Sequence, residues 1–260
     1  YLPNVDEIYS KIDFSRIQFK KFQKERHVNR FPIVHPAITS KGEIIFTSLY
    51  PIVKIDFNGK VMWVNDKNKF HHSINFDVDE NIYTASNIFP FSKKIEKFML
   101  KNDKGINYDL FEDHAVNIID QKGNILFTKS VAEIFIENGL THKIFSGNEW
   151  RTNPFHMNDV EPVLKDGPYF KKGDLFLSLR NLSMVILYRP KNNKIIKIIE
   201  GAFFNQHDVD ILNDEEISIY NNNNVLWSHR QKIASINEVI IYNFKTNKFS
   251  KKFEKAFKSL

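Results

Sequence analysis

The stretch His72-Ser-Ile-Asn-Phe-Asp-Val-Asp-Glu-Asn-Ile-Tyr-Thr84 contains the pattern that decides the fold. Apolar and polar residues alternate after His72, a polar turn follows at 79–81, and a second apolar strand begins at Ile82. Alternation on both sides of such a turn predicts a β-hairpin. The same order of histidine, alternating strand, turn and second strand occurs three more times, beginning at His35, His156 and His207.

A second hairpin follows each of the four, at 52–63, 115–127, 185–196 and 239–249. Two hairpins give four antiparallel strands, which make one blade of a β-propeller. We therefore predict an all-β propeller fold with four-stranded blades around a central channel, at residues 35–63, 72–128, 156–200 and 207–253.

The number of predicted blades is small for a closed ring, since propellers commonly have up to eight. We expect residues 31–260 to be a fragment of a ring of about six blades, incomplete at its C-terminus. Residues 1–30 are basic and form a separate, partly helical segment. The third blade begins late, because an insertion at 88–113 and a predicted helix at 130–138, ending at Gly139, come before it.

The innermost strand of a propeller blade lines the channel, so residues at one repeat position converge. We expect one histidine per blade to point into the channel. His71 precedes His72 and faces the other side of the strand, so only one of the two points squarely inward. Four histidines lie off this repeat position and are expected to be structural: His27, His114, His142 and His229.

Composition narrows the classes of function. The 260 residues contain no cysteine, which excludes disulfides, thiolate metal ligands and a cysteine nucleophile. No apolar run is long enough to cross a membrane. The net charge is +6, but the lysines are spread over turns such as 190–194. We therefore expect no nucleic-acid partner, and a general attraction for anionic substrates.

Converging imidazoles have three uses: they bind metals, transfer protons, or act as nucleophiles. Arg180 and Asn181 end the second strand of the third blade, Asn158 follows His156, and Gln206 precedes His207. An arginine opposes a metal cation but binds a tetrahedral oxyanion through its fork of donors. The sequence therefore predicts an anion-binding pocket.

Four motifs, in order, resemble those of the bacterial arylsulfotransferase family: Phe70-His-His-Ser-Ile-Asn75, Pro154-Phe-His-Met-Asn-Asp-Val160, Leu177-Ser-Leu-Arg-Asn-Leu182 and Phe204-Asn-Gln-His-Asp-Val209. The resemblance covers residues 31–245. It implies a propeller that moves a sulfuryl group from an aryl sulfate ester to a phenolic acceptor through a sulfohistidine, without a nucleotide donor.

The resemblance also implies roles for single residues. His207 matches the nucleophile, with Gln206 and Asp208 orienting its ring. His72, His156 and Arg180 hold the sulfuryl oxygens and manage protons. Residues expected to contact the substrate are His35, His71, Asn158, Asn181 and Gln206. Two departures concern substrate identity: Ser73 stands where an acid is common, and a loop at 161–172 lengthens the third blade.

The same resemblance implies no metal and no cofactor, small aryl sulfates and phenols as partners, a periplasmic or cell-envelope location, and a possible homodimer. Two other functions are left open by the residues alone. In the first alternative, the chain is a ligand-binding or scaffold propeller without catalysis. In the second, it is a metal-dependent lyase or hydrolase that uses the same histidines.

Overall fold

The structure is a computed structural model that describes residues 3–16, 31–48, 50–98, 111–145, 149, 151–201, 203–227, 230–233 and 236–253. The chain divides into two compact units. The first unit contains Tyr1–Lys101 and Asp113–Ser130, and the second contains Asn102–Glu112 and Val131–Leu260. His27, His229 and most of the predicted insertion lie outside the described residues.

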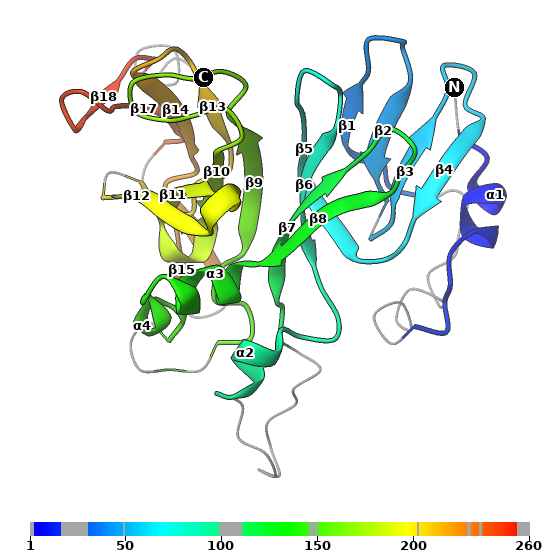
Figure 1. Cartoon of the computed structure of the whole chain (residues 1–260), viewed down its shortest axis with the longest axis horizontal. Coiled ribbons are helices and arrows are strands. Elements are labelled where there is room, and N and C mark those ends of the chain that lie inside the picture. Colours follow the sequence, from blue (N-terminus) through cyan, green and yellow to red (C-terminus); the bar gives the residue numbers. More distant parts are fainter. Residues whose placement is uncertain are drawn as a thin grey trace. The chain divides into compact units, whose positions relative to one another are not determined.

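The first unit contains two four-stranded antiparallel sheets (Figure 1). In each sheet the strands lie side by side in chain order, as consecutive hairpins require. Sheet 1 consists of β1 (Val34–Ile38), β2 (Ile44–Thr47), β3 (Ile52–Ile55) and β4 (Val61–Asn65). Sheet 2 consists of β5 (Lys69–Phe76), β6 (Ile82–Asn87), β7 (His114–Ile119) and β8 (Ile125–Ser130).

The second unit contains two more antiparallel sheets of four strands. Sheet 3 consists of β9 (Met157–Pro162), β10 (Leu175–Leu179), β11 (Met184–Arg189) and β12 (Lys194–Glu200). Sheet 4 consists of β13 (Val209–Ile211), β14 (Glu216–Asn221), β17 (Glu238–Asn243) and β18 (Lys248–Lys251). The hairpin of β15 (Asn224–Trp227) and β16 (Arg230–Ile233) interrupts sheet 4 and was not predicted.

The described helices are short. They are α1 (Val5–Ser10), α2 (Lys93–Glu96), α3 (Val131–Glu137) and α4 (Thr141–Ile144), with 3-10 turns at Arg180–Leu182 and Pro190–Asn192. The all-β prediction with four antiparallel sheets is therefore confirmed. The predicted helix after Ser130 is α3, and Gly139 follows it with a φ of 74°, the left-handed conformation that glycine adopts beyond helix ends.

A glycine at one hairpin turn allows sheets 1 and 2 to approach closely. Gly123 lies between β7 and β8 with a φ of 84°, and an added Cβ would come within 2.8 Å of the Trp63 ring. The indole Nε1–H of Trp63 donates to the Gln121 carbonyl (3.0 Å), and the Asn65 amide donates to the Gly123 carbonyl (2.8 Å). Any larger residue at 123 would displace this contact.

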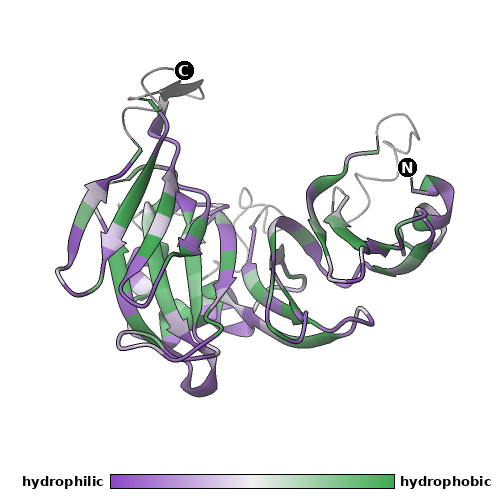
Figure 2. Cartoon of the chain, turned by 90° about the horizontal axis from the view of Figure 1, so that it is seen from above, coloured by the Kyte–Doolittle hydropathy of each residue, from purple (hydrophilic) through white to green (hydrophobic). Residues whose placement is uncertain are grey.

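Alternation along the strands gives sheet 1 two buried faces. Ile45 and Ile52 pack with sheet 2, against Phe70, Ile74, Ile82 and Ile119. The intervening residues face the opposite side and pack under the segment around α1. That cluster contains Val5, Ile8, Tyr9, Ile12, Phe14, Phe46, Val53, Ile55 and Val61. Figure 2 shows hydrophobic colour along much of the strands and hydrophilic colour at many of the turns.

Sheets 3 and 4 share a continuous apolar core that includes Phe176, Val185, Val209 and Ile240. Each fully buried side chain of this size stabilises the fold by about 2 kcal/mol. Polar contacts add to the apolar ones and fix how the two sheets meet. The buried carboxylate of Asp159 accepts the Val209 backbone N–H at 3.0 Å. This contact holds the start of β13, the strand that follows His207.

Candidate functional site

The backbone at the repeated histidines is unusual. His35, His72 and His156 have φ angles of 49°, 60° and 47°. Residues other than glycine seldom adopt this left-handed conformation. In sheets 1 and 2 the histidine lies at a β-bulge of the first strand, which redirects a side chain at that point. The fold therefore positions these three rings through local backbone distortion.

The prediction of four histidines at one repeat position is wrong for His207. In the stretch before β13 the residue with left-handed φ is Asn205, at 50°. The two sheets are aligned by the valine of the first strand, which pairs with the second strand in both: Val160 with Leu177 in sheet 3, and Val209 with Ile219 in sheet 4. Counting back from the two valines, Asn205 corresponds to His156, and His207 corresponds to Asn158. His207 thus lies two residues beyond the shared position, just before β13.

Four imidazoles gather in the first unit, and we call His35, His71, His72 and His114 the histidine cluster. The ring centroids of His71 and His72 are 4.8 Å apart, those of His71 and His114 5.1 Å, and those of His35 and His72 5.9 Å. His114, expected to be structural, is fully buried on β7 and packs against His71. His35 is exposed at the edge of the cluster, but desolvation lowers its pKa.

Hydrogen bonds connect the rings at the centre of this cluster. The Nδ1 atoms of His71 and His72 are 2.6 Å apart, and His71 Nε2 is 3.1 Å from the Oδ1 atom of Asn87. Asn87 ends β6, beside the strand that carries both histidines. Both members of the His71–His72 pair therefore have polar neighbours, and which of them points into a channel stays a prediction.

In the second unit, Asn153 determines the orientation of His156. The Asn153 Oδ1 atom accepts the backbone N–H of His156 (2.8 Å), which fixes the amide. Its Nδ2 atom faces His156 Nδ1 at 2.9 Å and donates to the carboxylate of Glu112 at 2.6 Å. Since Nδ2 only donates, Nδ1 of His156 accepts. Neutral His156 then carries its proton on Nε2, as a hydrogen-bond donor.

Arg180 follows β10 directly beside His156, and its backbone N–H donates to the His156 carbonyl (3.2 Å). The guanidinium donates to the Asn181 side-chain oxygen (3.2 Å), and Asn181 donates in turn to the Asn153 carbonyl (2.8 Å). Arg180 is half-buried, and burial lowers its pKa. No carboxylate among the described residues forms an ion pair with it. The arrangement leaves a desolvated cation able to bind an external anion.

His207 is oriented by two asparagines. Its Nδ1 atom lies 2.7 Å from Asn222 Nδ2 and 3.3 Å from the Asn205 carbonyl oxygen. Its backbone N–H donates to the Tyr220 carbonyl at 2.9 Å. The sequence had suggested Gln206 and Asp208 for the orienting role.

Gln206 and Asn158 are buried, and both contribute to the contact between sheets 3 and 4. The Asn158 amide donates to the Gln206 carbonyl (3.1 Å), and the Gln206 amide donates to the Met184 carbonyl (2.8 Å). Their side-chain oxygens are buried and have no hydrogen-bond partner among the residues that the structure describes. Their predicted contact with substrate is untested, and their amide groups support the strand that leads to His207.

Acidic residues gather beside β13. The pKa of Glu161 is raised to about 8, first by desolvation and then by the carboxylates of Asp159, Asp210 and Asp208. Desolvation, followed by repulsion from Asp210, also raises the pKa of Asp208. At least one proton is therefore held in this group near neutral pH.

Sequence reasoning missed the residues that orient the rings, Asn87, Asn153 and Asn222. Asn153 lies three residues before His156, a spacing at which a side chain caps a backbone N–H, and this signal was available. Asn87 and Asn222 come from neighbouring strands, and pairing registers are needed to find them. The exposed His142, on α4, takes no part in these contacts.

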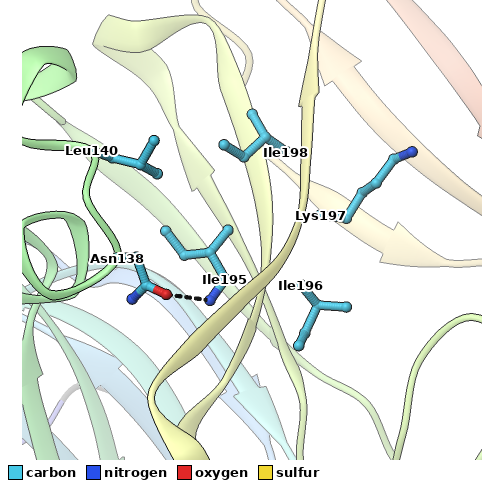
Figure 3. A pocket seen from close by; sticks show the side chains of 6 residues that line it. All are labelled: Asn138, Leu140, Ile195, Ile196, Lys197 and Ile198. Carbon is cyan, nitrogen blue, oxygen red and sulfur yellow. Dashed lines mark hydrogen bonds between the residues drawn. The ribbon is translucent and has the colours of Figure 1, made fainter.

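A cavity of about 370 Å³ lies elsewhere in the second unit, between the loop after α3 and β12 (Figure 3). Leu140 and three isoleucines line it together with Asn138, whose side-chain oxygen accepts the Ile195 N–H (3.1 Å). Its only charged lining group, Lys197, donates to Asn247 (2.7 Å). None of the predicted site residues lines this cavity, and its walls do not suit an anion.

Within the described part of the chain, no group of three or more His, Asp or Glu side chains could hold a metal ion. The metal-dependent alternative therefore finds no ligand set there. Among the same residues, no helix is long and apolar enough to cross a membrane.

In the second unit, the half-buried Arg180 has no ion-pair partner among the described residues and lies beside His156, whose ring is oriented by Asn153. Residues 41–259 match the family described as Arylsulfotransferase (ASST). The chain belongs to the arylsulfotransferase family, which confirms the resemblance seen in its motifs.

No curated protein matches the chain. Among solved structures it is similar to a protein of unknown function from Bacteroides caccae, at 10% identity and a TM-score of 0.42, over 87% of this chain and 84% of that one. It is also similar to virginiamycin B lyase from Staphylococcus aureus, at 12% identity and a TM-score of 0.44, over 85% of this chain and 55% of that one.

A third similar structure is the Pan2 WD40 domain from Neurospora crassa, at 12% identity and a TM-score of 0.48, over 86% of this chain and 52% of that one. The chain thus spans about half the length of the last two proteins. At such identities and TM-scores these likenesses say nothing about activity.

Proposed function

We propose that this protein transfers a sulfuryl group from an aryl sulfate ester to a phenolic acceptor through a sulfohistidine at His207. The observation that carries the proposal is membership of the arylsulfotransferase family across residues 41–259. Arg180 beside His156 supports it, since this guanidinium is half-buried and has no carboxylate partner among the described residues. A desolvated guanidinium binds a sulfate oxyanion more strongly than one in water.

In the proposed first step, neutral His207 attacks the donor sulfur through Nε2. The N–S bond forms as the bond from sulfur to the aryl oxygen breaks, and the aryl oxide leaves. In the second step the acceptor oxygen attacks the same sulfur and the N–S bond breaks. The phenolic proton of the acceptor passes to a base and finally to the first aryl oxide, so protons balance over the cycle.

The described contacts suggest a role for each partner. Arg180 and the Nε2–H of His156 would hold sulfuryl oxygens, where charge spreads in a loose transition state like that of phosphoryl transfer. His72 would manage the phenolic proton, with His71 against it. We further propose that the four sheets are blades of one propeller, that additional blades complete it, and that His72 faces the same channel as His156 and His207.

A periplasmic or cell-envelope location and small aryl sulfates as donors belong to the same proposal, as does the division into a basic segment at 1–30 and blades from residue 31. The basic net charge of +6 favours the approach of anionic donors. The alternative is a propeller that binds a ligand without catalysing transfer, and the following experiment distinguishes the two.

The test uses the full-length protein with a chromogenic aryl sulfate alone. We expect a mass increase of one sulfuryl group on a peptide that contains His207, and its loss when phenol is added. His207→Asn should abolish both labelling and transfer. The exposed His142→Asn is the control and should leave both unchanged. Absence of label, or label on another residue, would reject the mechanism.

A further inference from the structure

A run of four asparagines, Asn221–Asn224, connects β14 to β15, and each side chain or carbonyl there has a different contact. Asn221 Oδ1 accepts the backbone N–H groups of Phe204 (2.9 Å) and Asn223 (3.1 Å). Asn224 accepts the side-chain amide of Asn205 at both its carbonyl and its Oδ1 atom (2.7 Å each). The run thus binds the segment that leads to His207.

A buried carboxylate anchors this run from the neighbouring strand. The Oε1 atom of Glu238 accepts the amides of Asn221 (3.2 Å) and Asn223 (2.9 Å), and its Oε2 atom pairs with Lys251 (2.7 Å). Asn223 has a left-handed φ of 51°. Glu238 is only 4% exposed, so these bonds are made away from water, where they are strongest. The turn at 222 is therefore held on both sides.

Asn222 is the one member of the run that faces His207. The carbonyl of Asn205 near His207 Nδ1 only accepts, which favours a proton on Nδ1. The Nδ2 atom of Asn222, at 2.7 Å, only donates, which favours a bare Nδ1. The two contacts thus favour opposite tautomers, and the amide of Asn222 decides between them.

The Asn222 amide has no other hydrogen-bond partner among the residues that the structure describes. It is therefore able to turn by 180° and present Oδ1 to the ring instead. The contrast is Asn153, whose Oδ1 atom is held by the His156 backbone N–H. With Oδ1 towards the ring, both neighbours accept from Nδ1–H, and the lone pair that attacks sulfur is then on Nε2.

We infer that Asn222 is a positioning residue that selects the tautomer of His207, held in place by Glu238 through Asn221 and Asn223. The inference rests on the proposed function of His207 as nucleophile. When Nδ2 of Asn222 faces the ring, His207 carries its proton on Nε2 and does not attack sulfur. When Oδ1 of Asn222 faces the ring, Nε2 is unprotonated and nucleophilic.

The test compares two substitutions of Asn222 in the full-length protein. Asn222→Asp offers only acceptor oxygens, and Asn222→Leu offers neither donor nor acceptor. At a pH where the imidazole is neutral, the ¹⁵N spectrum of labelled histidine should show His207 as the Nδ1–H tautomer in Asn222→Asp. In Asn222→Leu, where only the 3.3 Å contact with the Asn205 carbonyl remains, it should show a mixture of both tautomers. Asn237→Ala is the matched control, because Asn237 is exposed and its side chain donates to the Tyr220 hydroxyl (3.1 Å), away from the His207 ring contacts given above. It should leave the spectrum unchanged.

Kinetics give the second readout. Asn222→Leu should lower the rate constant of His207 sulfation about 10- to 100-fold, as loss of an orienting partner does at other sites, with the donor KM changed less than about threefold. Asn222→Asp should keep the rate within about threefold of the parent protein.

Equal tautomers in the two variants, equal losses of rate, or a Leu variant as fast as the parent would overturn the inference. The spectrum of His207 needs no turnover. If the parent protein is never sulfated, the proposed function fails, while the tautomer comparison still decides the role of Asn222.

Discussion

His71 and His72 face each other through their Nδ1 atoms, at 2.6 Å. Two bare nitrogens repel at this distance, so one hydrogen lies between them. The Asn87 oxygen accepts from His71 Nε2, which places the His71 proton there and leaves its Nδ1 bare. The shared hydrogen therefore belongs to His72, and neutral His72 has a bare Nε2 suited to accepting a phenolic proton.

This relationship predicts the effect of removing Asn87. In Asn87→Leu, neutral His72 should lose its preference for the Nδ1–H form, because His71 is no longer fixed as the acceptor. The ¹⁵N spectrum of labelled histidine in this chain checks the change. Asn124→Ala, in the β7–β8 turn of the same sheet, is the control and should retain the parent spectrum. An unchanged His72 signal in Asn87→Leu would contradict the assignment.

Replacing Arg180 with lysine should lower the transfer activity. Arg180→Lys keeps a charge but loses the planar fork, so we expect transfer to fall by about 10²- to 10³-fold while some activity remains. Arg180→Met should fall further. Steady-state rates with a chromogenic aryl sulfate measure both, with the exposed Arg151→Lys as the control. Equal activities of the Lys and Met variants would show that charge at this position is unimportant.

Glu161 should make the protein less stable as pH rises. Its pKa is raised from 4.5 to about 8, so the folded state binds more protons than the unfolded state between these values. The free energy of unfolding therefore falls as pH increases through this window, and the loss is complete above about 8. Glu161→Gln should reduce the fall. Thermal unfolding at a series of pH values measures it, with the exposed Glu149→Gln as control. The same pH slope in Glu161→Gln and in the parent would refute the assignment.

Glu238 should be important for stability as well as for the turn it holds. Glu238→Leu leaves the buried amide of Asn221 without its acceptor, which costs about 1–3 kcal/mol, while the amide of Asn223 keeps its bond to the Ile236 carbonyl (2.9 Å). Denaturant unfolding should show a loss of about 1–3 kcal/mol, the cost of one unsatisfied buried amide. Glu215→Leu, at the surface beyond the other end of β14, should change stability by less than about 0.5 kcal/mol. A similarly small effect in Glu238→Leu would mean that the amide of Asn221 finds another partner.

The hairpins were predictable because their turns and alternation are local. Residues such as Asn58-Gly59 and Lys122-Gly123 define turns by their own conformational preferences. The register of His207 was not predicted, because the histidines themselves were aligned instead of the Asp-Val pairs 159–160 and 208–209. The pairs hold the sheet contacts, and aligning them places His207 correctly.

The orienting side chains were less accessible to sequence reasoning. Asn222 reaches His207 because β14 pairs with the strand that His207 precedes, and Asn87 reaches His71 because β6 pairs with β5. A run of four asparagines looks like a simple polar connection. The asparagines have separate roles because Glu238, at the start of β17, is buried and accepts hydrogen bonds from Asn221 and Asn223.

The left-handed backbone conformation of His35, His72 and His156 lowers the thermal stability of the fold. A side chain in that conformation costs about 1–3 kcal/mol unless its surroundings compensate, and glycine or asparagine adopts it more readily. Asn205 already shows the substitution that this fold accepts where no ring is needed. A laboratory selection for thermal stability alone would therefore replace these three histidines first, and the most stable variants would lack the imidazoles on which the proposed transfer depends.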